Sequence, residues 1–440
     1  MRAITLTEDI PFGVLDAKLI PGVEYLILDR QARDFARWRM SLDRFEREYQ
    51  AAAPEKQAEL DQLRPIAQGN KALGSFTSRD ADGLFRRWKS PNNLDKKKLL
   101  LIRAGGYGDL IMLMPLMKKI HTLWHRVRIG VSCIPRFANL LSAIPYVDPE
   151  LYVPFPIKGD DLNQFDYHVN FEDTIEWNPE AHDTHGAEMF GKWVNVPIRR
   201  EDHAVEFEPQ NHVMPEWAPA HKPVGEHWVG VFVAASARQR CWPVDWTFHL
   251  MNSLAMEGYT VCPLGGPLDL GMFGYHRKDG EGNHQFSHYL APPPGRFKPS
   301  LGSFRNLPQL ADFMRRYLDL VISPDTIGVH LAGMLKVPCL AIYGSFPAEL
   351  RMKHYPSVQA LQGQADCAPC FSHDAQMSCG AFWCKALAAI TPQQVYEKVK
   401  EICPRQQPGR IAKITLSPNA PLSAACLRPA GDRSILSMLR

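Results

Sequence analysis

The sequence predicts an α/β protein with two Rossmann-like, doubly wound parallel sheets facing a cleft, preceded by an extra α+β region. Three observations predict this fold class. From Leu99 onward, short apolar strands alternate with helical segments, which is typical of parallel sheets. The same alternation restarts after a proline-rich stretch at residues 209–223, so a hinge between two units is expected. The 440 residues suffice for roughly three domains of about 150 residues.

Composition excludes several classes of protein. Hydrophobic residues make up 45% of the chain and charged residues 22%, as in an ordinary globular protein. The net charge is only +3, so a protein that coats nucleic acid through bulk charge is not expected. Arg2, Glu8 and Asp9 interrupt any signal-like start, and no apolar run reaches the ~18 residues of a membrane helix. We therefore expect no transmembrane segment, no nucleic-acid partner and a cytoplasmic location.

Residues 1–95 differ from the rest of the chain. Short apolar runs between turn residues predict a small β-meander over residues 3–30, and residues 31–68 have the apolar spacing of a long helix or helical hairpin. Residues 69–93, rich in Gly, Ser, Asn and Asp, resemble a linker. We expect this region to lie outside the catalytic core and to serve oligomerisation or acceptor docking.

The first Rossmann-like unit is expected over residues 96–222. Its predicted elements are a strand at 99–102, a glycine-rich turn at 104–108, a helix at 109–123 and a strand at 127–133. The second unit is expected over residues 223–403. Its predicted strands are 228–234, 259–264, 318–323 and 338–343, and its predicted helices are 244–257, 307–316 and 328–335. The insertion at 267–303 and the tail at 404–440 show no clear periodicity.

Three loops that follow predicted strands carry candidate functional residues. The first contains Gly105, Gly106, Gly108 and Asp109, where the backbone can approach a ligand and a helix N-terminus attracts anions. A nicotinamide site is not expected, because the spacing is not G-x-G-x-x-G and the next strand ends at residues 132–133 without a carboxylate. Asp109 could accept a proton from a hydroxyl, or it could simply cap the helix.

The other two loops lie in the second unit. Arg238 and Arg240 follow a strand and could clamp phosphates, the alternative being a solvated surface loop. In the third loop, Asp325 or Thr326 can cap a helix whose exposed amides, up to Gly328, can bind a diphosphate. His330 follows one turn into that helix, as a ligand-binding residue or a core histidine.

The order of these motifs resembles the heptosyltransferases of glycosyltransferase family 9, bacterial inverting enzymes of the GT-B fold. The resemblance covers about residues 98–402, and its pieces occur in the family's order. They are Arg103 with Gly108-Asp109, Met114-Pro115-Leu116, Pro135-Arg136-Phe137, Ile144-Pro145-Tyr146-Val147-Asp148, Arg240-Cys241-Trp242-Pro243, Leu264-Gly265-Gly266-Pro267, Asp325-Thr326, His330-Leu331-Ala332, Val337-Pro338 and Tyr343-Gly344.

The resemblance implies a role for each loop. Asp109 corresponds to the general base, Arg240 with its neighbour Arg238 to the cations that neutralise the diphosphate, and Asp325, Thr326 and His330 to the donor-binding motif. Ile327 stands where the family usually has glycine, and Gly328 follows one place later. The implied donor is a nucleoside-diphosphate sugar, foremost ADP-heptose, and the acceptor a hydroxyl on a glycan, lipopolysaccharide core or protein. Neither NAD nor a catalytic metal is expected.

Four cysteines cluster near the C-terminus, within residues 367–384. Cys367, Cys370, Cys379 and Cys384 have knuckle-like spacing that predicts a structural Zn or Fe site, with His373 as a substitute ligand. Unconnected thiols are the alternative. A comparable iron-binding cysteine finger occurs in the autotransporter heptosyltransferase branch of the family, whose members carry an added N-terminal domain and glycosylate protein serines.

The sequence also contains a polar group at residues 182–188 and allows a second function. His182, Asp183, His185 and Glu188 form a dense polar set, better interpreted as a helix start lining the acceptor side of the cleft, or as solvent-exposed residues, than as a metal site. Trp193 could stack on a sugar or belong to the core. The alternative function is a non-catalytic nucleotide-sugar or protein-binding scaffold. Ile327 favours this alternative, whereas Asp109 argues against it.

Overall fold

The computed structural model describes two α/β units and short segments of the N-terminal region. The described residues are 93–204 except 173, 176 and 177, then 206–207, 212–266 except 236, 296–370 and 384–405. Residues 1–6, 10–12, 17–19, 23–27, 50, 57, 76–80, 277–278 and 284–285 are described as well. Apart from residues 50 and 57, the helix expected over 31–68 lies outside the described residues, as does the tail beyond 405.

The first unit is built on a parallel sheet of four strands. The order is β10-β6-β7-β8, formed by Tyr167–Asn170, Lys98–Ile102, Arg128–Cys133 and Val153–Pro154. Helices α4 (Tyr107–Leu123) and α5 (Gly186–Trp193) pack against each other. The predicted strands are confirmed, and the helix expected from Asp109 begins two residues earlier.

The second unit is built on a parallel sheet of five strands in the order β12-β11-β15-β16-β17. These strands are Thr260–Leu264, Trp228–Phe232, Leu320–Pro324, Cys339–Tyr343 and Val358–Gln362. Its helices are α6 (Val244–Met256), α8 (Leu307–Tyr317), α9 (Ile327–Leu335), α10 (Ala348–Met352) and α11 (Pro392–Ile402).

Strand alternation explains why this sheet is covered on both faces. Val321 and Ala341 belong to the hydrophobic cluster that includes α8 and α9, whereas Ile322 and Leu340 belong to the cluster that includes α6 and α11. Successive side chains of a strand point to opposite faces, so a wholly apolar strand needs helices on both sides. The doubly wound arrangement predicted from the sequence is confirmed.

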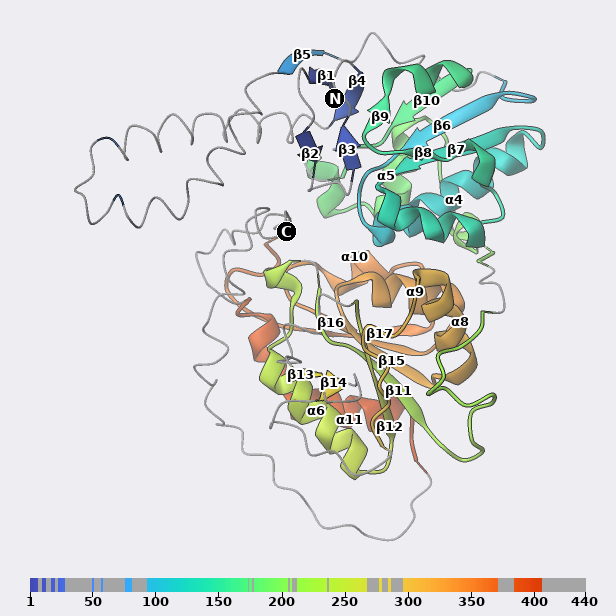
Figure 1. The fold of residues 1–440 in the computed structure, drawn as a ribbon. Coiled ribbons are helices and arrows are strands. Elements are labelled where there is room, and N and C mark those ends of the chain that lie inside the picture. The colour runs from blue at the N-terminus through green and yellow to red at the C-terminus, as the bar shows by residue number, and fades with distance from the viewer. Residues whose placement is uncertain are drawn as a thin grey trace.

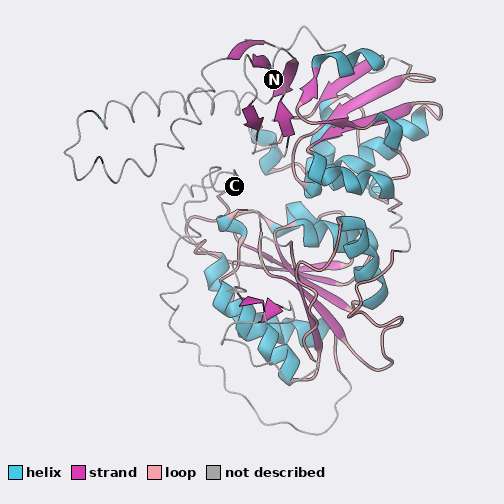
Figure 2. Ribbon diagram, viewed as in Figure 1, coloured by secondary structure: helices cyan, strands magenta, loops and turns pink. Residues whose placement is uncertain are grey.

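The two units lie one above the other in Figure 1, and Figure 2 shows the helices that flank each sheet. Helices α9 and α10 lie on the side of the second unit that faces the first, and α4 of the first unit contacts α9 of the second. We call this interface between the two units the seam. The carboxyl ends of β6 and β15 lead directly into α4 and α9. The loops that precede these two helices are therefore brought to the seam, where ligands bind in open α/β sheets. The domain boundaries at 95, 222 and 403 stay predictions.

The N-terminal region departs from two expectations. Its antiparallel sheet has the order β5-β1-β4-β9, from Phe76–Asp80, Arg2–Leu6, Glu24–Ile27 and Ile157–Lys158. Within the described residues, strands β2 (Ile10–Phe12) and β3 (Ala17–Leu19) pair only with each other, so the expected meander is wrong in its strand order. The expected linker contains β5, whose polar sequence gives no apolar alternation and which gains its backbone hydrogen bonds by pairing with β1.

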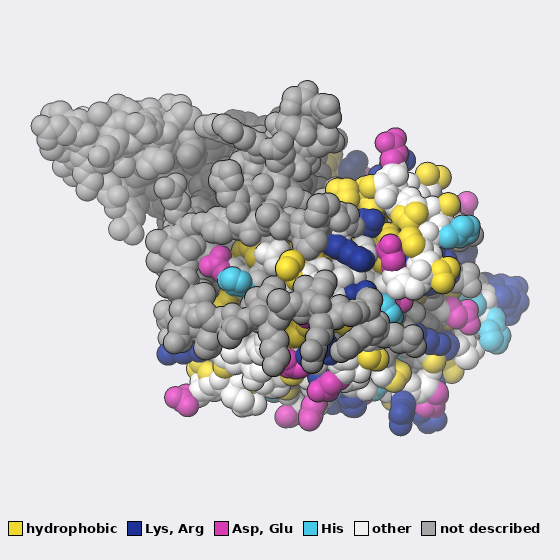
Figure 3. All heavy atoms as spheres, turned by 90° about the horizontal axis from the view of Figure 1, so that it is seen from below, with side chains coloured by type: hydrophobic (Ala, Val, Ile, Leu, Met, Phe, Trp, Pro, Cys, Tyr) yellow, Lys and Arg dark blue, Asp and Glu magenta, His cyan; other side chains and the backbone are white. Residues whose placement is uncertain are grey.

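Strand β9 lies between two parts of the first unit's chain, so the N-terminal sheet is joined to that unit by backbone pairing. In the insertion, β13 (Arg277–Lys278) and β14 (His284–Gln285) form a short antiparallel pair. Among the described helices, none is both long and apolar enough to cross a bilayer. On the face that Figure 3 shows, acidic and basic side chains of the described residues are interspersed.

Candidate active site

The glycine-rich loop after β6 holds Asp109 in a fixed position. Asp109 Oδ1 accepts a hydrogen bond from Arg103 Nη2 at 2.8 Å, and its Oδ2 accepts one from the Gly106 N–H at 2.8 Å. A Cβ added at Gly105 would lie 2.6 Å from Asp109 Oδ2, so only glycine leaves room for this arrangement. Asp109 therefore does cap α4, as one alternative expected. Its role as a base stays a prediction.

The groups around Asp109 determine its charge. Burial works to raise the pKa of Asp109, but the Arg103 charge and hydrogen bond, the Arg351 charge and the Gly106 N–H together hold it below its usual value. Its side chain is still 24% exposed. The carboxylate is therefore ionised at neutral pH and accessible from the seam.

A buried glutamate completes this part of the site. Glu172 Oε1 accepts a hydrogen bond from the Ala104 N–H, and Glu172 Oε2 lies 3.9 Å from Nη1 of the wholly buried Arg103. Arg103 thus lies between two carboxylates, those of Glu172 and Asp109. Glu172 was not predicted from the sequence because no strand is expected at 167–170. Arg103 follows the predicted strand at 99–102, but local spacing does not show that its guanidinium lies between two carboxylates. These two residues follow the adjacent parallel strands β6 and β10.

The third loop presents a helix N-terminus without a side-chain cap. Thr326 is the N-cap residue of α9, and its side chain makes no capping hydrogen bond. Asp325 is 4% exposed, and its Oδ2 has no hydrogen-bond partner in the described part of the chain. Both features suit a site that receives a polar ligand, since exposed amides attract anions and buried polar atoms need partners.

Gly328 has a packing role in this loop. A Cβ there would lie 2.4 Å from Phe232 Cδ2 and 2.6 Å from Ser323 Oγ. The displaced glycine of the motif is therefore required by the contact of α9 with the ends of β11 and β15.

His330 joins the first and third loops across the seam. A Cβ added at Gly108 would lie 3.1 Å from His330 Cδ2, and His330 Nδ1 is 3.1 Å from Tyr355 Oη. Burial lowers the pKa of His330 to about 4, with Asp325 working against this shift. The ring is therefore neutral at pH 7 in the protein without ligand. His330 is therefore buried, as the core alternative expected, and its role in ligand binding stays a prediction.

The second loop contributes cations to the same region. Arg240 is partly buried in the 3₁₀ turn Arg238–Arg240, and its charge acts on His330. The side chain of Arg238 lies outside the described residues. Arg351, on α10, also acts on both His330 and Asp109, and its guanidinium lies 4.2 Å from the Phe346 ring centroid. The sequence analysis missed Arg351 because the five-residue α10 is too short for its periodicity to be detected.

Three of the four clustered cysteines are described. Burial raises the pKa of the Cys384 thiol, and the nearby Cys370 and Cys367 thiols raise it further. The Cys370 N–H donates to the Ser345 carbonyl, which places this loop at the end of β16. Three thiols close together fit the donor set of a Zn or Fe site. Cys379 and His373 lie outside the described residues, so the four-cysteine site stays a prediction.

The second polar group is divided by the fold. His182 and Asp183 are exposed, whereas His185 begins α5, where its Nδ1 accepts a hydrogen bond from the Ala187 N–H at 3.2 Å. The interpretation as a helix start holds for His185 and Glu188, whereas His182 and Asp183 precede the helix; a place beside the acceptor stays a prediction. Trp193 is 56% exposed, so its assignment to the core is wrong.

Comparison with known proteins gives matches at the level of family and fold. Residues 184–380 match the model of glycosyltransferase family 9 (heptosyltransferase). The iron-containing dodecameric glycosyltransferase TibC from enterotoxigenic E. coli H10407 is 15% identical, over 71% of this chain and 77% of that one, with a TM-score of 0.50. This likeness confirms the expected fold.

Two further solved structures are similar at lower TM-scores. A glycosyltransferase family 9 protein from Veillonella parvula DSM 2008 is 16% identical, over 71% of this chain and 98% of that one, with a TM-score of 0.46. The E. coli ADP-heptose lps heptosyltransferase II is 14% identical, over 69% and 98%, with a TM-score of 0.49. No curated protein matches the chain.

Proposed function

We propose that the protein transfers a sugar from a nucleoside-diphosphate donor to an acceptor hydroxyl, starting from the match of residues 184–380 to the model of glycosyltransferase family 9. One observation supports this above all. An ionised, accessible carboxylate, Asp109, and the uncapped N-terminus of α9 lie on opposite sides of one seam, joined by the contact of Gly108 with His330. Displacement of a diphosphate at an anomeric carbon needs a base on one side and charge neutralisation on the other.

In the proposed reaction, Asp109 accepts the proton of the acceptor hydroxyl. The oxygen then bonds to the anomeric carbon as the bond from that carbon to the diphosphate oxygen breaks, which inverts the anomeric configuration in a single displacement. A carboxylate whose pKa is lowered is a weak base, but it stays ionised over a wide pH range. Proton transfer is needed only as the hydroxyl oxygen becomes acidic during attack.

The leaving diphosphate would be held by cations and by backbone amides. Arg240 and Arg238 supply charge from the second loop, Arg351 adds charge from α10, and Thr326 opens the α9 N-terminus toward the ligand. Asp325 Oδ2, buried without a partner in the described part, suits a sugar hydroxyl donor. Because these groups neutralise the diphosphate, the proposal requires no catalytic metal.

The finer identity of the substrates belongs to the same proposal. The family's description as heptosyltransferases favours a heptose, and ADP-heptose is the donor we propose. The acceptor is a hydroxyl on a glycan, lipopolysaccharide core or protein. TibC is described as iron-containing and dodecameric, which supports Zn or Fe at the cysteine loop and a role for residues 1–95 in oligomerisation or acceptor docking.

Calorimetric titration of the purified protein with ADP, UDP, GDP and NAD tests the donor site. We expect ADP to bind and NAD to remain without effect. Arg240→Ala should weaken ADP binding about tenfold or more, because a charge-assisted hydrogen bond contributes roughly 1.5–3 kcal/mol. Arg128→Ala, which removes an exposed pair with Asp148 in the first unit, is the matched control. Equal ADP affinity in Arg240→Ala and the control, or binding of no nucleotide, would contradict the proposed donor site.

A further inference from the structure

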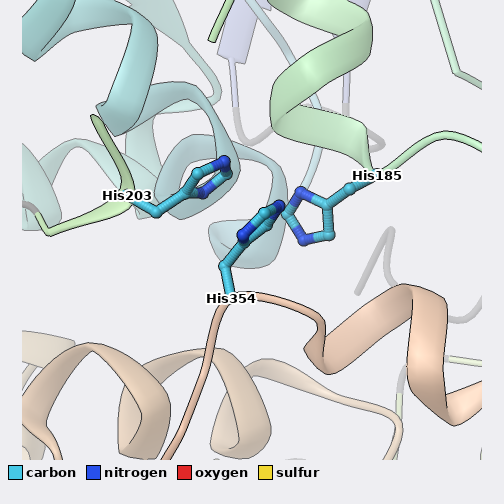
Figure 4. Close-up of side chains that lie close together, drawn as sticks. All are labelled: His185, His203 and His354. Atoms are coloured by element: carbon cyan, nitrogen blue, oxygen red, sulfur yellow. The ribbon is translucent and has the colours of Figure 1, made fainter. Parts of the chain in front are cut away.

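Three histidines that are far apart in sequence meet at the seam between the two units. His185 is the N-cap of α5, His203 ends the 3₁₀ turn Arg200–His203, and His354 follows α10. Figure 4 shows their rings pointing toward one another. One ring nitrogen of each lies within 4.8 Å of those of the other two. Two rings come from the first unit and one from the second, so the cluster exists only while the units are together.

The tautomer of His354 is fixed by a carboxylate. His354 Nε2 lies 3.0 Å from Glu188 Oε1, and Glu188 also pairs with Lys353 at 2.8 Å. Although partial burial works to raise the pKa of Glu188, the hydrogen bond and charge of Lys353 hold it below its usual value. The ionised carboxylate can only accept, so the proton lies on Nε2 and the lone pair on Nδ1. A carboxylate behind a histidine in this way is typical of metal-binding histidines.

The other two rings each have a buried nitrogen without a partner. Nε2 of His185 and Nε2 of His203 make no hydrogen bond within the described part of the chain, and His185 is only 2% exposed. Metal ions are coordinated by a lone pair of a neutral imidazole ring, so a metal ion would give these two buried nitrogens a partner.

We propose that His185, His203 and His354 form a binding site for a divalent transition-metal ion of the zinc class, which links the two units across the seam. Imidazole nitrogen is a ligand that Zn²⁺ prefers, whereas Mg²⁺ and Ca²⁺ prefer oxygen. Three histidines leave a fourth tetrahedral position to water. None of the three ligands belongs to the cysteine loop or to the groups assigned to the diphosphate, although the charges of His330 and Arg351 act on His185.

Coordination needs small movements that the local structure allows. Zn–N bonds of about 2.0–2.1 Å require nitrogens roughly 3.4 Å apart in a tetrahedron, which is closer than the 4.8 Å limit seen here. The His203 and His354 rings are stacked with centroids 3.4 Å apart, so they must rotate to direct their lone pairs at one point. If His185 binds the metal ion through Nε2, the ring proton must lie on Nδ1. Nδ1 then no longer accepts the 3.2 Å hydrogen bond from the Ala187 N–H, and the bond to the metal ion takes its place.

Zinc binding to the full-length chain and to single-histidine variants tests the proposal. Zinc per chain is measured by elemental analysis, and affinity by competition with a chromogenic chelator. The variants are His203→Gln, His354→Gln and the control His249→Gln, which replaces an exposed histidine on α6. Because every variant retains the cysteine loop, zinc held there cancels in the comparison. We expect the wild type and His249→Gln to bind one zinc ion more than His203→Gln and His354→Gln.

A variant outside the ligand set gives a second measurement. Glu188→Gln keeps all three rings, so it should retain the extra ion with an affinity lowered about 10–100-fold, the usual effect of removing a carboxylate behind a ligand. In the wild type, Co²⁺ added after the cysteine loop is filled should give visible bands without sulfur-to-cobalt charge transfer. Equal zinc stoichiometry in all variants, or Co²⁺ that binds only through sulfur, would overturn the proposal.

Discussion

Arg103 is the residue on which the position and charge of Asp109 depend. Its guanidinium is wholly buried and donates to Asp109 Oδ1 at 2.8 Å and to the Phe171 carbonyl at 3.1 Å. Two carboxylates, Asp109 and Glu172, lie on either side of it. In the sequence, Arg103 stands out only as one of the residues that carry the family resemblance. The local spacing of residues does not show that Arg103 neutralises two carboxylates.

Replacing Arg103 by Gln should affect both stability and the pH profile. Two carboxylates then lose their buried cation, which costs about 3 kcal/mol or more of unfolding free energy. The pKa of Asp109 rises as the Arg103 charge is lost, so the acid limb of the transfer rate should move to higher pH. Urea unfolding and a pH–rate profile measure the two effects. As a control, Arg128→Gln removes an exposed ion pair with Asp148 and should lose far less stability. An unchanged acid limb in Arg103→Gln would contradict the role of Arg103 in lowering the pKa of Asp109.

His330 makes stability depend on pH in a defined direction. Its pKa is about 4 in the folded protein and about 6.5 in the unfolded chain, so the unfolded chain binds more protons between these values. Stability from this residue is therefore lost as the pH falls below about 6.5.

The size of this effect is measured by difference. Between pH 7 and pH 5, wild type should lose about 2 kcal/mol more unfolding free energy than His330→Gln. Only this difference between the two pH values is compared, because the substitution also removes the contact with Tyr355 at both. Equal losses in the two proteins would show that His330 is not held neutral by the fold.

At the scale of elements, the strands of the two sheets could be predicted and the seam could not. Runs such as Leu99–Ile102 and Cys339–Tyr343 are apolar on both faces, and this is what the sequence displays for strands covered by helices on both sides. The order of strands in each sheet depends on tertiary pairing. The short β5 and the five-residue α10 carry too few residues for a periodic signal.

The candidate site could likewise be predicted only in part. Loops that follow parallel strands could be identified from the strand–helix alternation, and Asp109, Asp325 and His330 do face one seam. Glu172, Arg351 and the partners of His185 could not be found, because each is brought in by an element or a contact from the other part of the chain. Local spacing contains no information on such contacts.

Two glycines of these loops should respond differently to alanine. In Gly328→Ala the new Cβ would meet Phe232 and Ser323 at 2.4 and 2.6 Å, and overpacking of this kind costs about 1–3 kcal/mol. In Gly106→Ala the atom nearest to the new Cβ is Asp109 Oδ2 at 3.8 Å, and the backbone φ is −72°, which any residue adopts. Thermal unfolding should therefore show a clear loss for Gly328→Ala and little for Gly106→Ala. Equal melting temperatures would contradict the packing role of Gly328.

For the whole molecule, the seam between the units is where the proposed chemistry takes place. The first unit supplies Asp109 and the second supplies His330, Arg240 and the α9 N-terminus. Lys353 and His354 of the second unit contact the Glu188 carboxylate of the first. These polar contacts connect the two units beside the site. Neither unit alone contains both the base and the diphosphate groups, and the account therefore predicts that transfer needs the complete pair.

If Asp109 is the base for transfer from a bound nucleotide sugar, removing its charge should stop transfer without releasing the donor. The most direct test compares Asp109→Asn with the wild type and with Asp160→Asn, an exposed carboxylate in the first unit. Donor binding is measured by calorimetry and sugar transfer by mass spectrometry of the acceptor. The account predicts near-normal donor binding in Asp109→Asn with transfer lowered about 100-fold or more, as expected for loss of a general base. Transfer within a few-fold of wild type, with the donor bound, would contradict it.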